Sequence, residues 1–216
     1  MKPNTLKTFW HVLLLAFLLI VFLTGSFIGG SFYPNKWTVE KLEDEFHKKE
    51  VDSIVLLGLQ EPEFEFDGPN SFMDAVGKCV DYINFTTDRK SRVPKSIVIA
   101  MAGVESAWGT SRFAKEGNNL FGVRTWDLNT PHMKPLGIPD AKFGLKMYET
   151  KCKSIKDMIN ILNNHPAYEK FREERLVQIK QGYWDYPKLL EGIKAWSTNS
   201  KYTKMIYATI VDRKLP

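Results

Sequence analysis

The chain has 216 residues, enough for one domain with a sizeable core. Its net charge of +5 is modest, and the basic residues are mixed with acids, so no basic face with interleaved aromatic rings predicts nucleic-acid binding. The four histidines are scattered without the spacing of metal ligands, and there is no Gly-rich phosphate loop. We therefore expect neither a metal nor a cofactor.

The first predicted element is an apolar helix. No formally charged residue occurs from Thr8 to Asn35, and about twenty residues at 1.5 Å each match the roughly 30 Å hydrocarbon core of a membrane. Lys2 and Lys7 precede this stretch without an acid, so the positive-inside rule predicts a cytoplasmic tail at 1–8, a transmembrane anchor at 9–28 and export of the rest. A cleaved signal peptide is the alternative, although no clear small-x-small cleavage site follows.

The exported part is expected to be mainly α-helical. Residues 29–70 are predicted to form a stalk or N-terminal arm, with a charged helix over 36–49, a strand over 51–60 and an acidic loop over 61–69. The remaining residues, 71–216, form the predicted domain. Its helices are expected over 71–82, 94–108, 151–163, 167–180, 186–196 and 201–211, and the prolines between 125 and 142 predict an irregular lobe.

One carboxylate interrupts an otherwise apolar helix. Glu105 follows Val98 by seven residues and Met101 by four, so it falls on the buried face, near the C-terminal end that we expect Gly109 to terminate. Burial and the negative end of the helix dipole both disfavour ionisation, which predicts a raised pKa. A carboxyl group that keeps its proton near neutral pH can act as a general acid. An idle surface glutamate is the alternative.

The residues after Glu105 are typical of a sugar site. Trp108, Phe121 and Trp126 offer flat apolar faces for pyranose rings, and the adjacent Asn118 and Asn119 supply amide groups for hydroxyls and N-acetyl groups. Core packing is the alternative for each aromatic ring.

The segment VESAWGTSRFAKEGNNLFG closely resembles the catalytic segment of bacterial peptidoglycan β-N-acetylglucosaminidases, glycoside hydrolase family 73, in particular its Bax-type branch. Weaker similarity continues through Tyr148, the segment from Asn163 to Arg175 and the terminal helices, and covers roughly 71–215. The resemblance implies a lysozyme-like helical domain that hydrolyses the GlcNAc-β-1,4-MurNAc bond of peptidoglycan, with Glu105 as general acid. It implies substrate contacts by Trp108, Asn119, Phe121, Trp126, Tyr148, Trp196 and Tyr202.

The chain departs from the family pattern at two places. Trp196 stands where the family usually has a tyrosine, and no glutamate occupies the small lobe where many relatives carry a second acid. Asp127, Asp140 and Glu149 are the candidates for that second carboxylate, with Glu149 expected inside the following helix. A single-acid route, through the substrate N-acetyl group or through the MurNAc 6-hydroxyl as in a lytic transglycosylase, stays open.

Three functions are therefore compatible with the sequence: a membrane-anchored glycosidase, a lytic transglycosylase of the same fold, and a non-catalytic cell-wall-binding scaffold. A phage lysin with an arrested signal would share every feature. The expected location is the cell inner membrane, single-pass, with the domain facing the periplasm or cell wall, or secretion if the apolar helix is a signal peptide. Cys79 and Cys152 lie on the exported side, where a disulfide is permitted, but two separate buried thiols fit equally well.

Overall fold

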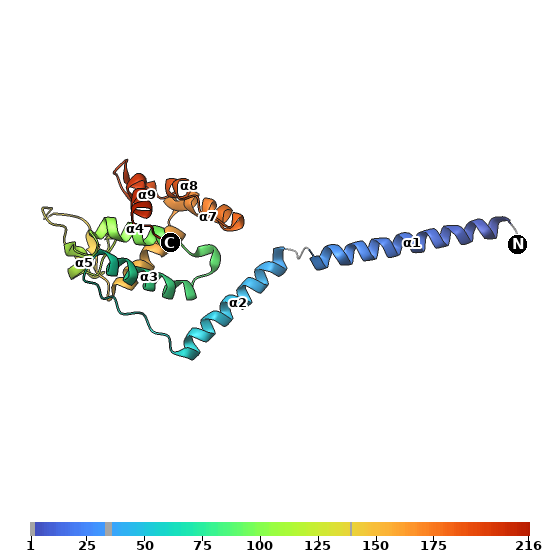
Figure 1. Ribbon diagram of the computed structural model, residues 1–216, viewed down its shortest axis with the longest axis horizontal. Coiled ribbons are helices and arrows are strands. Elements are labelled where there is room, and N and C mark those ends of the chain that lie inside the picture. Colours follow the sequence, from blue (N-terminus) through green and yellow to red (C-terminus); the bar gives the residue numbers. More distant parts are fainter. Residues whose placement is uncertain (1–2, 33–35, 139) are drawn as a thin grey trace. The chain divides into compact units, whose positions relative to one another are not determined.

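The computed structural model describes residues 3–32, 36–138 and 140–216 (Figure 1). Residues 1 and 2 of the predicted tail, and Pro139 of the predicted lobe, lie outside these ranges. The chain divides into two units, Met1–Lys49 and Glu50–Pro216, which are described separately.

The N-terminal unit contains the predicted apolar helix. Helix α1 spans Pro3–Phe32, and within it Lys7–Phe27 is long and apolar enough to cross a membrane, a test that a signal sequence also passes. Helix α2 begins at Lys36 and continues to Leu57, into the second unit. The strand predicted over 51–60 is therefore wrong. The helix meets no breaker before Gly58, whose φ of +60° is the left-handed geometry that ends helices.

The second unit is mainly helical, with a small sheet. In chain order its elements are α3 (Pro69–Phe85), η1 (Arg89–Ser91), α4 (Lys95–Ser106), α5 (Arg112–Glu116), β1 (Arg124–Thr125), β2 (His132–Met133), β3 (Gly144–Lys146), α6 (Lys151–Asn164), η2 (Pro166–Tyr168), α7 (Glu169–Gln181), α8 (Tyr186–Glu191), η3 (Lys194–Trp196) and α9 (Tyr202–Asp212). The helix predictions from residue 71 onward are confirmed, with shifted ends and with the segment over 186–196 divided into α8 and η3.

Helix α4 lies at the centre of this unit. It packs against both α3 and α9, and α3 also packs against α6 (Figure 1). Ile97, Val98 and Met101 of α4 are fully buried, and so are Phe72 and Val76 of α3. Because apolar residues line several sides of α4, its position is fixed by the core, and so is any side chain near its end.

Helix α4 ends at Ser106 rather than at the expected Gly109. The buried Ser106 hydroxyl donates to the Ala102 carbonyl at 2.6 Å and accepts from the Gly109 amide at 2.7 Å. The side chain thus satisfies backbone groups at the helix end three residues earlier, and Ala107 takes a left-handed conformation there.

The predicted irregular lobe contains a small antiparallel sheet in the order β1-β3-β2. Arg124 pairs with Leu145, and His132 pairs with Lys146. Each strand has only two or three residues, which is too short for an alternating pattern to be visible in the sequence. Glu149 lies before α6 rather than within it, because Thr150 caps that helix by accepting from the Lys153 amide.

A disulfide joins Cys79 of α3 to Cys152 of α6, with 5.4 Å between the Cα atoms. Both residues are buried in the core. This resolves the alternative left open by the sequence in favour of a bridge. The bridge fixes the two helices to each other at a point where their apolar faces already pack.

Candidate active site

Glu105 is the penultimate residue of α4 and is half-buried. Burial raises the pKa of its carboxyl group, and an interaction with Tyr202 opposes part of that rise. The position adds a second cause, since the negative end of the α4 dipole disfavours another negative charge. The direction of the shift is the one predicted from the sequence, and it favours a protonated carboxyl above the pH at which an exposed glutamate ionises.

Tyr202 begins α9 and is the polar side chain that acts on Glu105. It is 3% exposed, and its hydroxyl has no hydrogen-bond partner among the described residues. Burial and the neighbouring Glu105 carboxyl both raise the pKa of Tyr202, so its hydroxyl stays protonated and available as a donor. An unpartnered buried hydroxyl is costly, which makes Glu105, or a ligand oxygen bound beside it, the natural acceptor.

Replacing Tyr202 with phenylalanine is expected to move the alkaline limb of the pH–activity profile to higher pH. Tyr202 lowers the pKa of Glu105, so its loss raises that pKa and keeps the acid protonated at higher pH. The free energy of unfolding should change by less than about 1 kcal/mol, because the interaction of the hydroxyl with Glu105 falls short of a well-formed hydrogen bond. A pH–rate profile beside a denaturation curve measures both; an unshifted limb contradicts the coupling.

An aromatic cluster adjoins this pair. Tyr168 acts electrostatically on Tyr202, and its ring centroid lies 5.9 Å from that of Trp196. The Trp196 ring meets Phe121 edge-on at 6.4 Å. The structure therefore brings four predicted residues together: Glu105, Phe121, Trp196 and Tyr202. Tyr168 was not predicted as a site residue. It lies near His165 in the segment from Asn163 to Arg175 that resembles the family, and that resemblance could have indicated it. Phe121 is almost fully buried, so its contacts here are with protein.

The turn after α4 is conformationally unusual. Ala107, Trp108 and Gly109 have φ angles of 49°, 56° and 81°, a run that disfavours side chains with a Cβ. The turn folds the Trp108 ring back onto α4, where a Cβ on Gly103 would lie 2.5 Å from it. Phe72 meets the ring edge-on, and the Arg213 guanidinium lies 4.8 Å from its centroid. These contacts give Trp108 a packing role beside the acid.

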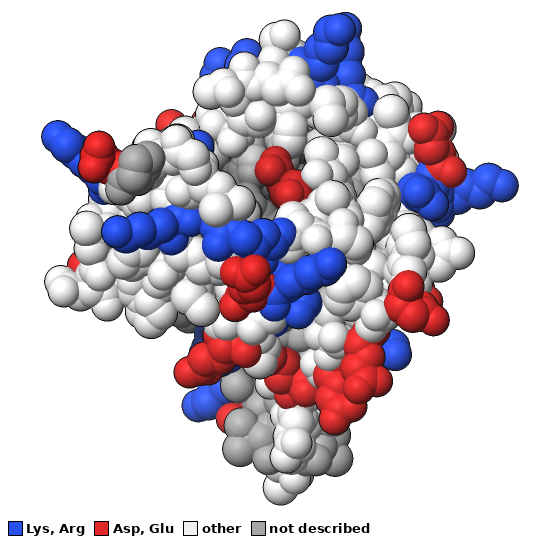
Figure 2. Space-filling view, turned by 90° about the vertical axis from the view of Figure 1, so that its left-hand side faces the viewer, with Lys and Arg blue, Asp and Glu red and all other residues white. Residues whose placement is uncertain are grey.

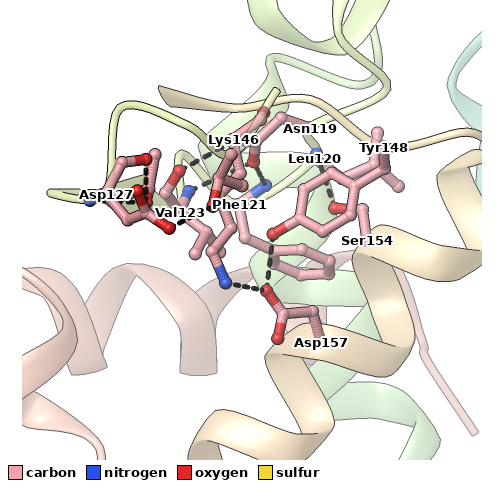
Figure 3. A network of polar contacts seen from close by, with 11 residues as sticks. Asn119, Leu120, Phe121, Val123, Asp127, Lys146, Tyr148, Ser154 and Asp157 are labelled. Atoms are coloured by element: carbon pink, nitrogen blue, oxygen red, sulfur yellow. Dashed lines mark hydrogen bonds and ion pairs between the residues drawn. The ribbon is translucent and has the colours of Figure 1, made fainter. Parts of the chain in front are cut away.

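Asn119 organises the loop that follows α5 (Figure 3). Its amide nitrogen donates to the carbonyls of Val123 and Lys146 at 3.0 and 2.9 Å, and its oxygen accepts from the amides of Phe121 and Val123. The residue is 1% exposed, so its amide group is occupied within the protein. In this structure Asn119 positions Phe121 and the lobe and presents no free group to a sugar.

Replacing Asn119 with alanine is expected to lower the free energy of unfolding by about 2–4 kcal/mol, since four hydrogen bonds are lost at a buried position. Activity should fall with it, because the loop carrying Phe121 loses its support. Urea denaturation measures the change. Asn129→Ala is the control, because this loop position is exposed and its side chain makes no hydrogen bond to the described residues.

A second network joins the lobe to the helical body (Figure 3). Asp157 of α6 accepts from the Lys146 ammonium at 2.9 Å and from the Tyr148 hydroxyl at 2.7 Å. Burial and the Asp157 carboxylate both raise the pKa of Tyr148. One turn earlier on α6, Ser154 accepts from the Leu120 amide at 3.1 Å. Asp157 was not predicted. It follows Ser154 by three residues, beside the buried apolar residues of α6, and this spacing could have indicated that the two polar side chains act together.

The lobe also carries the remaining predicted residues. Trp126 is 70% exposed, with its ring centroid 6.4 Å from that of Phe143, and is the only predicted binding residue whose ring is mostly open to solvent in the described chain. The Asp127 carboxylate caps its own turn through the Asn129 amide and the Thr130 hydroxyl. Asp140 and Glu149 are exposed. None of these three acids is buried in a way that resembles Glu105.

Figure 2 shows one face of the molecule, where charged side chains of both signs are scattered and a central hollow holds acidic atoms among mostly uncharged groups. Two cavities of about 350 and 360 Å³ lie elsewhere, beside η1, and Glu105 lines neither. No group of His, Cys, Asp or Glu in the described residues could hold a metal ion. The arrangement at Glu105 is thus a single carboxyl group beside a buried hydroxyl and aromatic rings.

Comparison with known proteins identifies a family that this chain matches. The family model "Glucosaminidase: Mannosyl-glycoprotein endo-beta-N-acetylglucosaminidase" matches residues 85–215. The curated protein bax of Escherichia coli K12 is 29% identical over 134 residues, which are 61% of this chain and 47% of that protein. The chain thus spans about half the length of that relative.

The comparison with solved structures gives further matches. The catalytic domain of the autolysin Auto from Listeria monocytogenes has a TM-score of 0.52 at 21% identity, covering 78% of this chain and 94% of that one. A peptidoglycan hydrolase from Sphingomonas sp. A1 has a TM-score of 0.48 at 18% identity, covering 65% and 86%. The segment matched by the family model contains Glu105, Tyr168, Trp196 and Tyr202.

Proposed function

The chain belongs to the glucosaminidase family, glycoside hydrolase family 73, and we propose that it is a membrane-anchored hydrolase of the GlcNAc-β-1,4-MurNAc bond of peptidoglycan with Glu105 as its general acid. The observation that carries the proposal is a half-buried glutamate with a raised pKa, held against a buried tyrosine inside the matched segment. The similar fold of the catalytic domain of Auto, an autolysin, supports the substrate class.

Glu105 would donate its proton to the glycosidic oxygen as the bond to the anomeric carbon breaks. The leaving sugar then departs as a neutral alcohol, and positive charge develops at the anomeric carbon. Water supplies the hydroxyl that replaces the leaving group, and its remaining proton returns to the Glu105 carboxylate. Tyr202 would hold the carboxyl group in place and donate to it while it is ionised.

The aromatic and lobe residues would bind the glycan on either side of the acid. Trp126 has the exposed ring that can stack on a pyranose face, and Trp196 lies half-buried beside Tyr168. Trp108, Asn119, Phe121 and Tyr148 are engaged with protein groups, so we propose that they shape the site rather than contact the sugar. This revises the role that the sequence suggested for these four.

A lytic transglycosylase is the second candidate, because one observation favours it. The described acids of the lobe and its edge, Asp127, Asp140 and Glu149, are all exposed, and Asp127 is committed to its own turn. A reaction that uses the MurNAc 6-hydroxyl as nucleophile needs no second carboxylate to activate water.

The chemical identity of the new glycan ends tests the proposal. We expect digestion of purified sacculi, followed by borohydride reduction and mass spectrometry, to show reduced GlcNAc at the new ends. Anhydro-MurNAc ends would replace the hydrolase with the transglycosylase, and reduced MurNAc ends would show that the other glycosidic bond is cut. No new ends at all would favour the wall-binding scaffold.

We propose that α1 serves as the anchor, with the domain on the outer side of the inner membrane. Lys7–Phe27 has the length and composition for this role, and Lys2 and Lys7 at its N-terminal side set the orientation. Mass measurement of the protein recovered from membranes should give the uncleaved chain; a mature N-terminus after about residue 28 would instead identify a signal peptide.

A further inference from the structure

A cavity of about 350 Å³ lies between η1, the start of α4 and the turn that follows α7. Its volume falls within the range of small-molecule sites. It is lined by polar, basic and aromatic side chains and a few apolar ones: Asn84, Arg89, Arg92, Val93, Pro94, Lys95, Gln178, Ile179, Gly182, Tyr183 and Trp184. The proposed catalytic mechanism uses none of these residues.

The charged residues that line this cavity are all basic. Arg89, Arg92 and Lys95 contribute three cations, and no Asp or Glu among the described residues lines the cavity. Arg92 is oriented by donating from its Nε to the Thr87 carbonyl at 2.9 Å. Lys95 pairs with Asp81 at 2.6 Å, which offsets part of its charge. Arg89 is exposed, and an arginine can bind a carboxylate through two parallel hydrogen bonds, which favours an anionic ligand.

Aromatic rings form another part of the wall. Gly182 ends α7 with φ of +79°, and the chain then turns to present Tyr183 and Trp184, which are 61% and 38% exposed. A large aromatic side chain that stays this exposed gains little from the core, and its flat face is suited to an apolar ring face.

One residue that lines the cavity carries an unsatisfied polar atom. Asn84 is among the residues that line this cavity. Its amide oxygen is buried and has no hydrogen-bond partner in the described chain. Such an atom is expected to accept from a ligand hydroxyl or N–H, since buried amide groups are rarely left unpaired. Cations, a ring surface and an amide acceptor together specify a ligand with an acid group, a ring and hydroxyl or amide donors.

The cavity is separate from the candidate active site. Lys95 and Glu105 lie at opposite ends of α4, ten residues or roughly 15 Å apart along the helix axis. A ligand of monosaccharide size at one end of α4 does not reach the other, whereas a polymer does.

We propose that this cavity is a second binding site for the substrate polymer, which recognises a carboxylate-bearing unit of the wall glycan at a distance from the bond that is cut. The inference rests on the proposed function for the identity of the polymer. Arg89 binds the carboxylate, Tyr183 and Trp184 contact a sugar ring, and Asn84 accepts a hydroxyl or amide proton. A membrane headgroup fits less well. Binding a phosphate at a flat membrane surface needs neither a concave site nor aromatic side chains.

The test is co-sedimentation of the full-length protein in detergent with intact sacculi, all variants carrying Glu105→Gln so that the wall is not digested. The double variant Arg89→Ser/Tyr183→Ser should require about tenfold more sacculi for half-maximal binding. Both side chains are exposed, so the fold should be preserved, which a melting curve checks. Lys170→Ser/Tyr207→Ser, two exposed residues outside the cavity, is the matched control and should bind like the parent.

Two further arms decide the nature of the ligand. Arg89→Lys/Tyr183→Phe keeps the charge and the ring, and should restore most of the binding; soluble muropeptides should compete with sacculi and glycerol phosphate should not. Unchanged binding by the Ser double variant, or competition by glycerol phosphate alone, overturns the proposal. Cleavage of sacculi by the chain with Glu105 present is scored separately, so loss of this site and failure of the proposed function are distinguishable.

Discussion

Replacing Glu105 with glutamine is expected to lower the rate of glycan hydrolysis by about 10²- to 10⁴-fold, with binding to sacculi unchanged. The amide has nearly the shape of the protonated carboxyl group but has no proton to transfer, so only the chemical step is affected. Release of reducing ends from sacculi measures the rate, and co-sedimentation measures binding. Glu173→Gln, an exposed acid on α7, is the control and should be as active as the parent.

The same substitution should stabilise the protein at neutral pH. Because burial raises the pKa of Glu105 in the folded state, the folded chain binds more protons than the unfolded chain at pH values between the unfolded and folded pKa. Stability contributed by this group is therefore present in acid and is lost as pH rises through the folded pKa. Glu105→Gln should melt at a higher temperature than the parent at pH 7 and at the same temperature near pH 4. A lower melting temperature at pH 7 would show that the ionised carboxylate is well satisfied.

Removal of the Cys79–Cys152 disulfide is expected to have the largest effect on stability. The bridge closes a loop of 73 residues, for which chain entropy alone gives about 4 kcal/mol. For a unit of this size that loss corresponds to a fall of about 10 °C in melting temperature. The variant Cys79→Ala/Cys152→Ala and the reduced parent protein should melt at similar temperatures, both below the oxidised parent. These are the only cysteines in the chain, so reductant should leave the double variant unchanged.

If reductant does not lower the melting temperature of the parent, the bridge is not what holds α3 and α6 together, and their apolar contacts are sufficient. The physical reason to expect otherwise is that the bridge restricts the unfolded chain between the two helices, whatever packing exists in the folded state.

Helices α3 and α6 could be predicted because each carries one apolar stripe. Phe72, Val76 and Val80 gave α3, and Ile155, Met158 and Leu162 gave α6; all six are buried. Two errors had local causes. The run from Val51 to Leu57 is apolar enough for a strand, but it continues a helix that only Gly58 ends. The end of α4 depends on hydrogen bonds of Ser106, which spacing does not reveal.

The candidate site could be predicted only in part. Glu105 could be predicted because packing alone does not explain an acid on the buried face of an apolar helix. Tyr202 and Trp196 followed from family resemblance alone, because no local pattern joins the end of α4 to the start of α9. Asn119 illustrates the limit: its residue type fits a sugar ligand, but its position in a tight loop makes the backbone its partner. Which amides face a ligand is set by tertiary contacts, and these are absent from local sequence.

A ¹³C NMR titration of glutamate side-chain carboxyl groups, with Glu105→Gln to assign the resonance, tests most directly whether Glu105 holds its proton in the folded protein. The pKa of Glu105 is predicted to lie above that of the exposed glutamates of the same chain, and to rise further in Tyr202→Phe. A pKa of Glu105 at or below that of the exposed glutamates would contradict the assignment of this residue as the general acid.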